Sequence, residues 1–364
     1  MTKKLWMEKA LELARQGEGY VLHQPYQSIL LVSGDDILFS WAEDGKEALD
    51  DALNRQSIKQ GGILYLPYEP DMIPKLMLWI LHSSILRIEI SALNAITPHE
   101  FVKWAEDNKI EVHVGLLKEE GLRLNEVYFH SIKSDIPFIT LSFGMSLDGK
   151  IATVTGDSKY ISGSESRIFI HQLRNKHQAI LVGINTVKID HPSLTTRLDQ
   201  DISRNPDKII LDSNLQIDEE EPLLHQNNQS RTIIVTRKDA NQAKKNRLKK
   251  LKVIIIEIEN EVVPMDLKEV LTKLKSIGVE SVLVEGGGTI HFSFIKGHYF
   301  NRLYATISPI IIGGENAKTA VSGEGFMTLQ EAVKLNFDRV FPLGQDYIFE
   351  ATQKADMTKE KNHA

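Results

Sequence analysis

The chain has 364 residues, 42% of them apolar and 25% charged, so it is long enough for two domains and has a globular composition, not a disordered or fibrous one. Its formal net charge of −6 gives no overall basic surface for nucleic acid. The absence of cysteine excludes disulfides, thiolate zinc sites, iron–sulfur clusters and a cysteine nucleophile. We expect a cytoplasmic protein without a membrane partner, because no window approaches the ~18 apolar residues of a membrane span and the N-terminus lacks a signal peptide's apolar core.

Apolar periodicity in the first part of the chain predicts alternating helices and strands. Such alternation predicts a mostly parallel sheet with helices on its faces. In chain order the expected elements are a helix at 6–16, a strand at 28–32, a helix at 46–57, a strand at 63–66, a helix from Pro74, a strand at 87–90, a helix from Pro98 and a strand at 111–116.

The second part of the chain shows a similar alternation. Ser162 and Glu165 have the spacing of a capping box and predict a helix start there. Short β-branched runs predict strands at 138–143, 179–182, 208–211, 232–235, 253–256, 281–284 and 303–307. With the polar stretch 130–135 as a boundary, we expect one domain at 1–136, a second at 137–352 and a disordered tail at 353–364.

The segment Glu285, Gly286, Gly287, Gly288 and Thr289 follows a β-branched strand and precedes an apolar helix. Glycine lets the backbone approach a ligand, and the N–H groups at a helix start can hold phosphate oxygens. The segment is not the dinucleotide fingerprint GxGxxG, and a simple tight turn is the alternative. Glu285 lies at the carboxyl end of its strand, where α/β sheets place their ligands.

Lys150 follows an Asp-Gly turn directly after the first strand of the second domain. That turn places the lysine at the same sheet edge as Glu285, where it could bind an anion or polarise a hydroxyl. A solvated lysine on an ordinary turn is the alternative.

The longest informative segment contains Arg174, Thr186, Asp190 and Arg197. The two arginines could meet one phosphate, because guanidinium groups match phosphate oxygens in geometry and charge. Composition alone favours the alternative, in which each arginine forms a surface salt bridge.

A basic run at 237–252 lies between two expected strands and is most simply the solvated face of a helix. In a second interpretation, Arg237 or Lys238 meets the 2′-phosphate of NADP because both follow a strand. His171, His177 and His191 do not have the spacing of a zinc motif.

Taken together and in order, the segments 143–162, 166–197, 208–217, 283–295 and 308–326 closely resemble the reductase domain of RibD-type riboflavin-biosynthesis proteins. The resemblance covers residues 137–352. It implies a dihydrofolate-reductase-like α/β fold and an NADPH-dependent reduction of the ribose of 5-amino-6-(5-phosphoribosylamino)uracil to a ribityl chain.

The resemblance also implies roles for individual positions. Three residues are expected to act in the reaction, namely Lys150, Asp190 and Glu285. Substrate contacts are expected at Lys150, Ser158, Arg174, Leu194, Arg197 and Glu285, the two arginines serving the 5-phosphate. NADPH contacts are expected at Gly144, Tyr160, Thr186, Asp190, Ser213, Gly287, Gly288, Thr289 and on to Ser293. Tyr160 stands where the family commonly has Trp, and His191 where it has a second Asp.

The first domain resembles the family's cytidine-deaminase-like α/β/α domain but lacks its zinc ligands. A working deaminase needs His-Ala-Glu, Pro-Cys and a later Cys. This sequence has Gly45, Lys46 and Glu47 at the first motif and Glu69, Pro70 and Asp71 at the second. We therefore expect no metal and no deaminase activity, with Glu47 left as a surface carboxylate.

The expected function is thus an NADPH-dependent reductase of a phosphorylated pyrimidine, with no nucleic-acid partner. The resemblance also implies a homodimer. Two alternatives stay open: a reductase of a related pterin, of dihydrofolate or of a natural-product intermediate on the same fold, and a catalytically silent ligand-binding protein.

Overall fold

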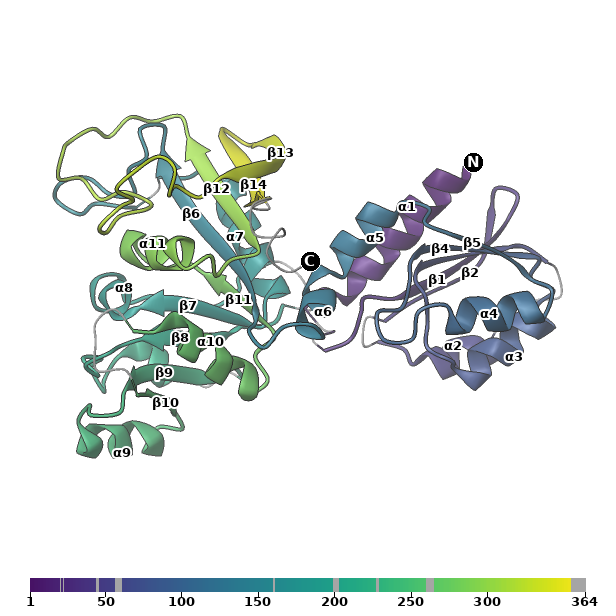
Figure 1. The fold of residues 1–364 in the computed structure, drawn as a ribbon, viewed down its shortest axis with the longest axis horizontal. Helices are drawn as coiled ribbons and strands as arrows, with labels where there is room; N and C mark the ends of the chain where they lie inside the picture. The colour runs from purple at the N-terminus through teal and green to yellow at the C-terminus, as the bar shows by residue number, and fades with distance from the viewer. Residues whose placement is uncertain are drawn as a thin grey trace. The chain divides into compact units, whose positions relative to one another are not determined.

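The computed structural model describes residues 1–19, 21, 23–43, 46–55, 61–159, 161–198, 203–226, 229–259 and 265–354. The chain divides into two compact units, Met1–Lys133 and Ser134–Ala364, which are described separately below (Figure 1). Within the described part, every helix is too short or too polar to cross a lipid bilayer.

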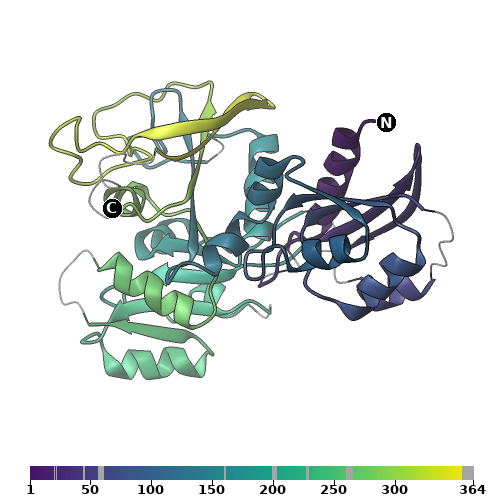
Figure 2. The ribbon, with the colours of Figure 1, turned by 45° about the vertical axis from the view of Figure 1, so that its right-hand side comes forward.

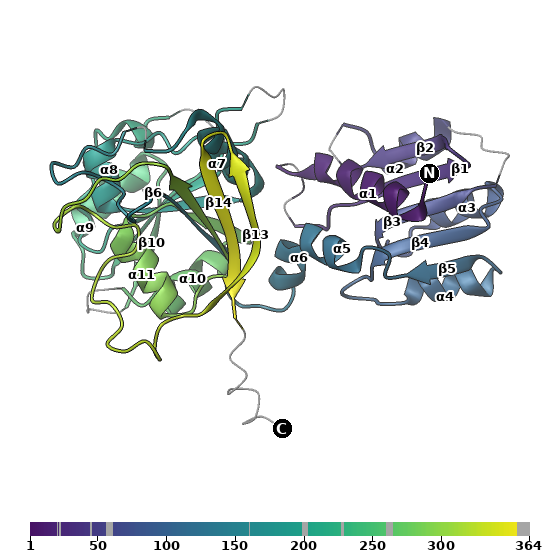
Figure 3. The same cartoon turned by 90° about the horizontal axis from the view of Figure 1, so that it is seen from above.

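The first unit is built on a five-stranded sheet. Its order is β2 (Asp36–Ala42), β1 (Ser28–Ser33), β3 (Ile63–Tyr68), β4 (Arg87–Ala92) and β5 (Glu111–Val114), as Figure 3 shows. β1 is antiparallel to both β2 and β3, while β3, β4 and β5 are parallel. The expected mostly parallel sheet is therefore wrong for this half. The two-residue turn Gly34–Asp35, with Gly34 at φ +60°, closes a hairpin that adds the unpredicted strand β2.

Helices cover both faces of this sheet and make three layers. Figure 1 shows α1 and α5 on one face and α2, α3 and α4 on the other. Alternation along β1 explains the layers, because Leu30 and Val32 pack with α1 whereas Ile29 and Leu31 pack with α3 and α4. The helices are α1 (Lys3–Ala14), α2 (Leu49–Arg55), α3 (Pro74–His82), α4 (Glu100–Asp107), α5 (Lys118–Leu124) and α6 (Glu126–Ser131), with a short 3₁₀ turn at Arg15–Gly17.

The second unit is built on a nine-stranded sheet. All seven expected strands are present and parallel, and an antiparallel hairpin that the periodicity did not predict extends the β12 edge (Figure 2). The order is β10 (Ile254–Ile258), β9 (Thr232–Arg237), β8 (Asp207–Leu211), β7 (Ala179–Gly183), β11 (Ser281–Val284), β6 (Phe138–Ser146), β12 (Arg302–Ser308), β14 (Asp346–Gln353) and β13 (Leu335–Leu343).

Two cores lie on opposite faces of this sheet. Leu181 and Ile209 pack with apolar residues of α10 and α11 on one face, and Ile180 and Ile210 pack with Val187 and residues of α9 on the other. Both faces are covered, as the continuous β-branched runs predict. The helices are α7 (Ser164–Lys176), α8 (Ile184–Asp190), α9 (Gln242–Lys250), α10 (Leu267–Ser276) and α11 (Gly288–Lys296), with a 3₁₀ turn at Pro222–Leu224.

Two local expectations are wrong. The expected helix is present as α7, but the capping box is not: the N-cap is Gly163, whose N–H donates to the Asp346 carboxylate at 2.7 Å, and Glu165 accepts from Ser164. The tail does not begin at 353, because Gln353 belongs to β14 and its amide donates to the backbone of His298 and Phe300. Residues 355–364 lie outside the described residues.

Candidate active site

The parallel strands of the second unit all end at one edge of the sheet, which gathers the segments that follow them. Neighbouring strands are ~4.8 Å apart, so the loops form a row in the order of the strands. From β9 to β12 the strands end at Arg237, Leu211, Gly183, Val284, Ser146 and Ser308 (Figure 1).

The glycine turn follows β11 and begins α11. Gly287 is the N-cap and has no side chain to accept from the first N–H groups of the helix. A Cβ at Gly287 would meet nothing within 4 Å, so this helix start is open to an approaching group. A Cβ at Gly288 would lie 2.5 Å from the carbonyl oxygen of Thr319. Gly287 thus leaves room for a phosphate at the helix start, and Gly288 is required for packing.

Arg174 and Glu285 form a two-bonded ion pair. Arg174 donates from Nε to Oε1 of Glu285 at 2.8 Å and from Nη2 to Oε2 at 2.6 Å. Its remaining Nη1 donates to the carbonyl oxygen of Thr195 at 2.9 Å. Both side chains are about 15% exposed, 14% for Arg174 and 15% for Glu285. Two residues that the resemblance assigns separately to the substrate are therefore one charge-compensated unit.

The segment that carries Arg197 is held against α7. The N–H of Arg197 donates to Nδ1 of His171 at 3.3 Å, and its Nη2 donates to Oγ of Ser193 at 3.3 Å. Leu194 has φ +50° and is buried, which fixes the direction of this segment. The Arg197 side chain itself is exposed.

His171 is a residue of this cluster that sequence reasoning did not single out. Partial burial is the main cause that lowers the pKa of His171, and the positive charges of Arg174 and Arg197 lower this pKa further. The imidazole is therefore neutral at pH 7 and accepts the Arg197 N–H. The available signal was helical spacing, since His171 lies one turn before Arg174 on α7.

Lys150 lies on the turn after β6, and its Nζ donates to the carbonyl oxygen of Ala317 at 3.3 Å. Asp148, two residues earlier, accepts from Ser146 Oγ at 2.6 Å and from the N–H groups of Ile312 and Gly313. The Ser146 hydroxyl and then these two N–H groups lower the pKa of Asp148 to about 2. This carboxylate ties the Lys150 turn to the loop after β12, a role that sequence reasoning missed.

The remaining predicted residues lie along the same edge or beside it. Thr186 and Asp190 are on α8, directly after β7, and Ser213 follows β8. Gly144 is within β6, and Ser158 is exposed on the loop that follows the Lys150 turn. Thr289 is in the first turn of α11. The His191 ring bonds the Glu221 carboxylate at 3.0 Å. Tyr160 lies outside the described residues.

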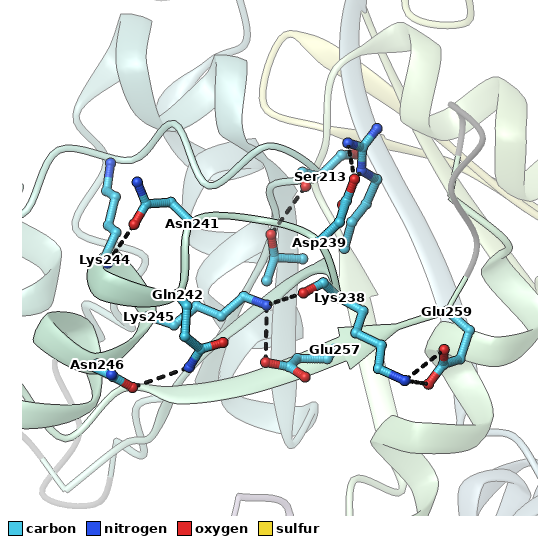
Figure 4. Close-up of polar contacts among 12 residues, drawn as sticks. Ser213, Lys238, Asp239, Asn241, Gln242, Lys244, Lys245, Asn246, Glu257 and Glu259 are labelled. Carbon is cyan, nitrogen blue, oxygen red and sulfur yellow. Dashed lines mark hydrogen bonds and ion pairs between the residues drawn. The ribbon is translucent and has the colours of Figure 1, made fainter.

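The basic run after β9 is only in part a solvated face. Lys245 is fully buried and donates to the carbonyl oxygen of Lys238 at 2.7 Å and to Glu257 at 3.0 Å (Figure 4). The expectation of a solvated face is wrong at this position, because a buried ammonium group requires such partners.

In the first unit, the residues at the position where the resemblance expects the second zinc motif bond neighbouring backbone groups. The Glu69 carboxylate is fully buried and accepts from the N–H groups of Asn94 and His99 at 3.0 Å and of Val102 at 3.2 Å. Asp71 accepts from the Asn94 side chain at 2.8 Å. These acidic groups fix the loop after β4 and the first turn of α4.

At the position where the resemblance expects the first motif, the carbonyl oxygen of Glu47 accepts from Nε1 of Trp41 at 3.0 Å, just before α2. Gly45 lies outside the described residues. Among the residues that the structure does describe, three or more histidine, aspartate or glutamate side chains nowhere gather in a group able to hold a metal ion.

Comparison with known proteins assigns the second unit to a family. Residues 137–349 match the sequence model of the RibD C-terminal domain. The chain is 34% identical to the riboflavin biosynthesis protein RibD of Bacillus amyloliquefaciens, over 97% of this chain and 96% of that protein. It is 36% identical to a 2,5-diamino-6-ribosylamino-4(3H)-pyrimidinone 5′-phosphate reductase of Methanothermobacter thermautotrophicus, over 60% of this chain and 99% of that enzyme.

A solved structure agrees over both units. It is the deaminase/5-amino-6-(5-phosphoribosylamino)uracil reductase of Thermotoga maritima, with a TM-score of 0.81 and 25% identity over 96% of this chain and 98% of that one. The fold class is therefore confirmed: a deaminase-like α/β/α unit followed by a reductase-type α/β unit. With sequence and fold matching over nearly the whole length, the chain belongs to the RibD family.

Proposed function

We propose that the chain is an NADPH-dependent reductase of riboflavin biosynthesis that converts the ribosyl group of 5-amino-6-(5-phosphoribosylamino)uracil to the ribityl chain. The observation that carries the proposal is the sheet edge of the second unit. It brings an open helix start, the Arg174–Glu285 pair and the Arg197 segment onto neighbouring loops. The names of the relatives supply the reaction class and the pathway.

The site fits a dinucleotide because Gly287 leaves the first turn of α11 uncovered. The N–H groups of Gly288 and Thr289 would hold the pyrophosphate, and Thr186, Asp190 and Ser213 would continue the contacts along the edge. When bound, NADPH supplies a hydride. The protein's contribution is to position the sugar beside the cofactor and to exclude water.

The Arg174–Glu285 geometry refines the expected substrate contacts. All three guanidinium nitrogens of Arg174 are bonded, to Glu285 and to Thr195. Arg174 is therefore a positioning residue that orients the Glu285 carboxylate toward the substrate. Arg197, on the exposed side of the same segment, meets the 5-phosphate. Lys150 orients the sugar from the turn after β6.

We propose that the first unit has no deaminase activity. The chain has no cysteine, and Glu69 and Asp71 at the former motif bond the backbone and side chains around α4. Zinc-activated hydroxide needs thiolate and imidazole ligands that these positions do not provide.

A second substrate is favoured by one observation. The 36% match to the diaminopyrimidinone phosphate reductase covers 99% of that enzyme, which makes its substrate the second candidate. The two pyrimidines differ at one exocyclic group, and both carry the phosphorylated ribose that Arg197 would bind.

We also propose a homodimer formed through the β13 edge. β13 is an edge strand, and Leu335, Phe337 and Val340 on it are exposed. An edge strand with exposed apolar side chains is a surface that a second copy can cover. Light scattering coupled to gel filtration checks the mass, and Phe337→Lys is expected to shift it toward the monomer.

The decisive experiment follows NADPH oxidation with each pyrimidine phosphate and with dihydrofolate as substrates. Turnover of a pyrimidine phosphate, with none of dihydrofolate, supports the proposal. Activity on folate alone contradicts it, and no NADPH binding would identify a silent ligand-binding protein. Parallel deaminase assays and metal analysis are expected to give no ammonia release and no stoichiometric zinc.

A further inference from the structure

The end of β9 places a cationic side chain, Arg237, beside the loops at the carboxyl ends of β8, β7 and β11, which carry the expected NADPH contacts. We propose that Arg237 binds the 2′-phosphate of NADPH and thereby selects this dinucleotide over NADH. The inference rests on the proposed function for the presence of a dinucleotide, and it goes beyond that function by assigning the group that discriminates between the two cofactors.

Arg237 is fixed to the segment that the family resemblance assigns to the cofactor. Its N–H donates to the carbonyl oxygen of Ser213 at 3.2 Å, and the hydroxyl of Thr236 donates to the same oxygen at 3.1 Å. The last residues of β9 and the loop after β8 are therefore one structural piece. A ligand that touches Ser213 is beside Arg237.

The strand order sets which end of a dinucleotide reaches this position. The open helix start at Gly287 follows β11, and β7 and β8 lie between β11 and β9. At ~4.8 Å per strand, the edge from β11 to β9 spans about 14 Å. A pyrophosphate at Gly287 and an adenosine that extends along this edge bring the 2′ position toward Ser213 and Arg237.

The guanidinium of Arg237 already holds an anion in the required geometry. It donates from Nε to Oδ1 of Asp239 at 2.9 Å and from Nη2 to Oδ2 at 2.8 Å. Asp239 is 53% exposed, whereas Arg237 is 24% exposed. A phosphate offers the same paired oxygens with more charge, so it can displace the exposed carboxylate into water.

Two cations near Arg237 bond other groups. Lys238 bonds both oxygens of Glu259, at 2.9 and 3.0 Å, and Lys245 is buried against Glu257. Figure 4 shows Ser213 and Asp239 together on one side of the strand ends, apart from the Lys238–Glu259 pair. Arg237 is therefore the residue assigned to the phosphate.

The test measures binding of 2′,5′-ADP, NADPH and NADH to the full chain by calorimetry. Arg237→Met should weaken 2′,5′-ADP and NADPH by about 10- to 100-fold, the range for one charged hydrogen-bonded contact, and leave NADH within about twofold. Asp239→Asn should tighten 2′,5′-ADP several-fold, because a competing and repelling carboxylate is removed. Lys249→Met, which removes a charge from the exposed end of α9, is the matched control and should change nothing.

The two variants act in opposite directions, so loss of folding cannot produce the expected pattern. Equal weakening of NADPH and NADH by Arg237→Met, no weakening at all, or weaker binding with Asp239→Asn overturns the inference. If the wild type reduces a pyrimidine phosphate but shows one of these results, only the assignment of Arg237 fails. If the wild type binds no dinucleotide and reduces no pyrimidine phosphate, the proposed function fails and this inference fails with it.

Discussion

Arg174 and Glu285 lie 111 residues apart in the sequence and share two hydrogen bonds in the fold. The sequence motifs place both residues in the substrate site, but as independent contacts. The bidentate geometry supports the proposed change of roles, because each guanidinium nitrogen of Arg174 already donates one hydrogen bond to protein, two of them to the Glu285 carboxylate. At the scale of the residue, chemical type was predictable and pairing was not.

This division of roles predicts the effect of Arg197→Ala. The variant removes the exposed guanidinium assigned to the 5-phosphate, so the KM for the pyrimidine phosphate should rise about 10- to 100-fold. The KM for NADPH should change by less than about threefold, because Arg197 itself is not among the expected cofactor contacts, although Thr186 and Asp190 precede it in the same β7–β8 connection. Steady-state kinetics with each ligand varied in turn measure both values.

Arg247→Ala is the control for that experiment, since Arg247 is exposed and pairs with Glu219, and neither residue is among the expected site residues. It should leave both KM values unchanged. A parallel rise in both KM values for Arg197→Ala would show that the phosphate contact is misassigned.

His177 predicts a pH dependence of stability. Burial lowers its pKa to about 4, and its ring nitrogens contact the carbonyl oxygen of Leu173 and the hydroxyl of Thr140. An unfolded histidine titrates near 6.5, so the unfolded state binds the proton first as the pH falls. The contribution of His177 to the free energy of unfolding is therefore complete above pH 6.5 and decreases as the pH falls from 6.5 to 4. At pH 5 the free energy of unfolding is lower by about 2 kcal/mol.

Urea unfolding at pH 7.5 and 5.0 measures this loss. His177→Gln should be less stable at pH 7.5, because the two contacts are disturbed, but should lose about 2 kcal/mol less than the wild type between the two pH values. The same pH loss in both proteins would mean that other groups cause it. Burial also lowers the pKa of His291, so this residue adds a pH-dependent loss of the same sign to the wild type and to His177→Gln alike.

Among the elements, the strands with buried β-branched runs were predictable, and the β13–β14 hairpin was not. β13 is exposed along most of its length and has an irregular register between Phe337 and Arg339. It therefore shows no clear alternation of apolar and polar residues. Its pairing depends on β14, where Glu350 is fully buried and bonded to Arg302 and Arg339. A local pattern cannot reveal such a cross-strand network.

The start of α11 gives a prediction from two adjacent glycines. Gly288→Ala places a Cβ 2.5 Å from the Thr319 carbonyl and the Ser322 hydroxyl, so the helix must shift, at a cost of about 1–3 kcal/mol. Gly287→Ala meets nothing within 4 Å and should keep the wild-type melting temperature. It should nevertheless weaken NADPH binding, because its methyl group enters the space assigned to the pyrophosphate.

Thermal unfolding and calorimetric titration of both variants separate packing from ligand binding. A Gly287→Ala protein that melts normally and binds NADPH as tightly as the wild type would remove the pyrophosphate from this helix start. An unchanged melting temperature for Gly288→Ala would contradict the close approach of the 319–322 loop.

For the whole molecule, the core clusters of the two units share no residue, which predicts two independently folding units. The cores of the first unit contain residues between Trp6 and Leu124, and those of the second contain residues between Ile139 and Phe349. Residues 134–354 include every predicted reductase residue. A relative that matches 60% of this chain over 99% of its own length is named as a reductase.

Residues 134–354 produced alone should therefore unfold in one cooperative transition and reduce the pyrimidine phosphate with kcat/KM within about threefold of the full chain. Residues 1–133 alone should also fold, and they should show neither reductase nor deaminase activity on the pyrimidine phosphates. Loss of cooperative unfolding in the isolated second unit would show that the first unit is required for its stability.

The α/β class, the parallel strands of the second unit, the glycine turn and the residue types of the expected site could all be predicted from the amino-acid sequence. These follow from local periodicity and from motifs of adjacent residues. Four further features required the folded chain: β1 is antiparallel to its neighbours, Arg174 bonds Glu285, the His171 ring accepts from the Arg197 N–H, and the Arg237 N–H donates to Ser213. Each of these contacts joins residues far apart in the chain, and strand order and packing, which no local pattern encodes, bring them together.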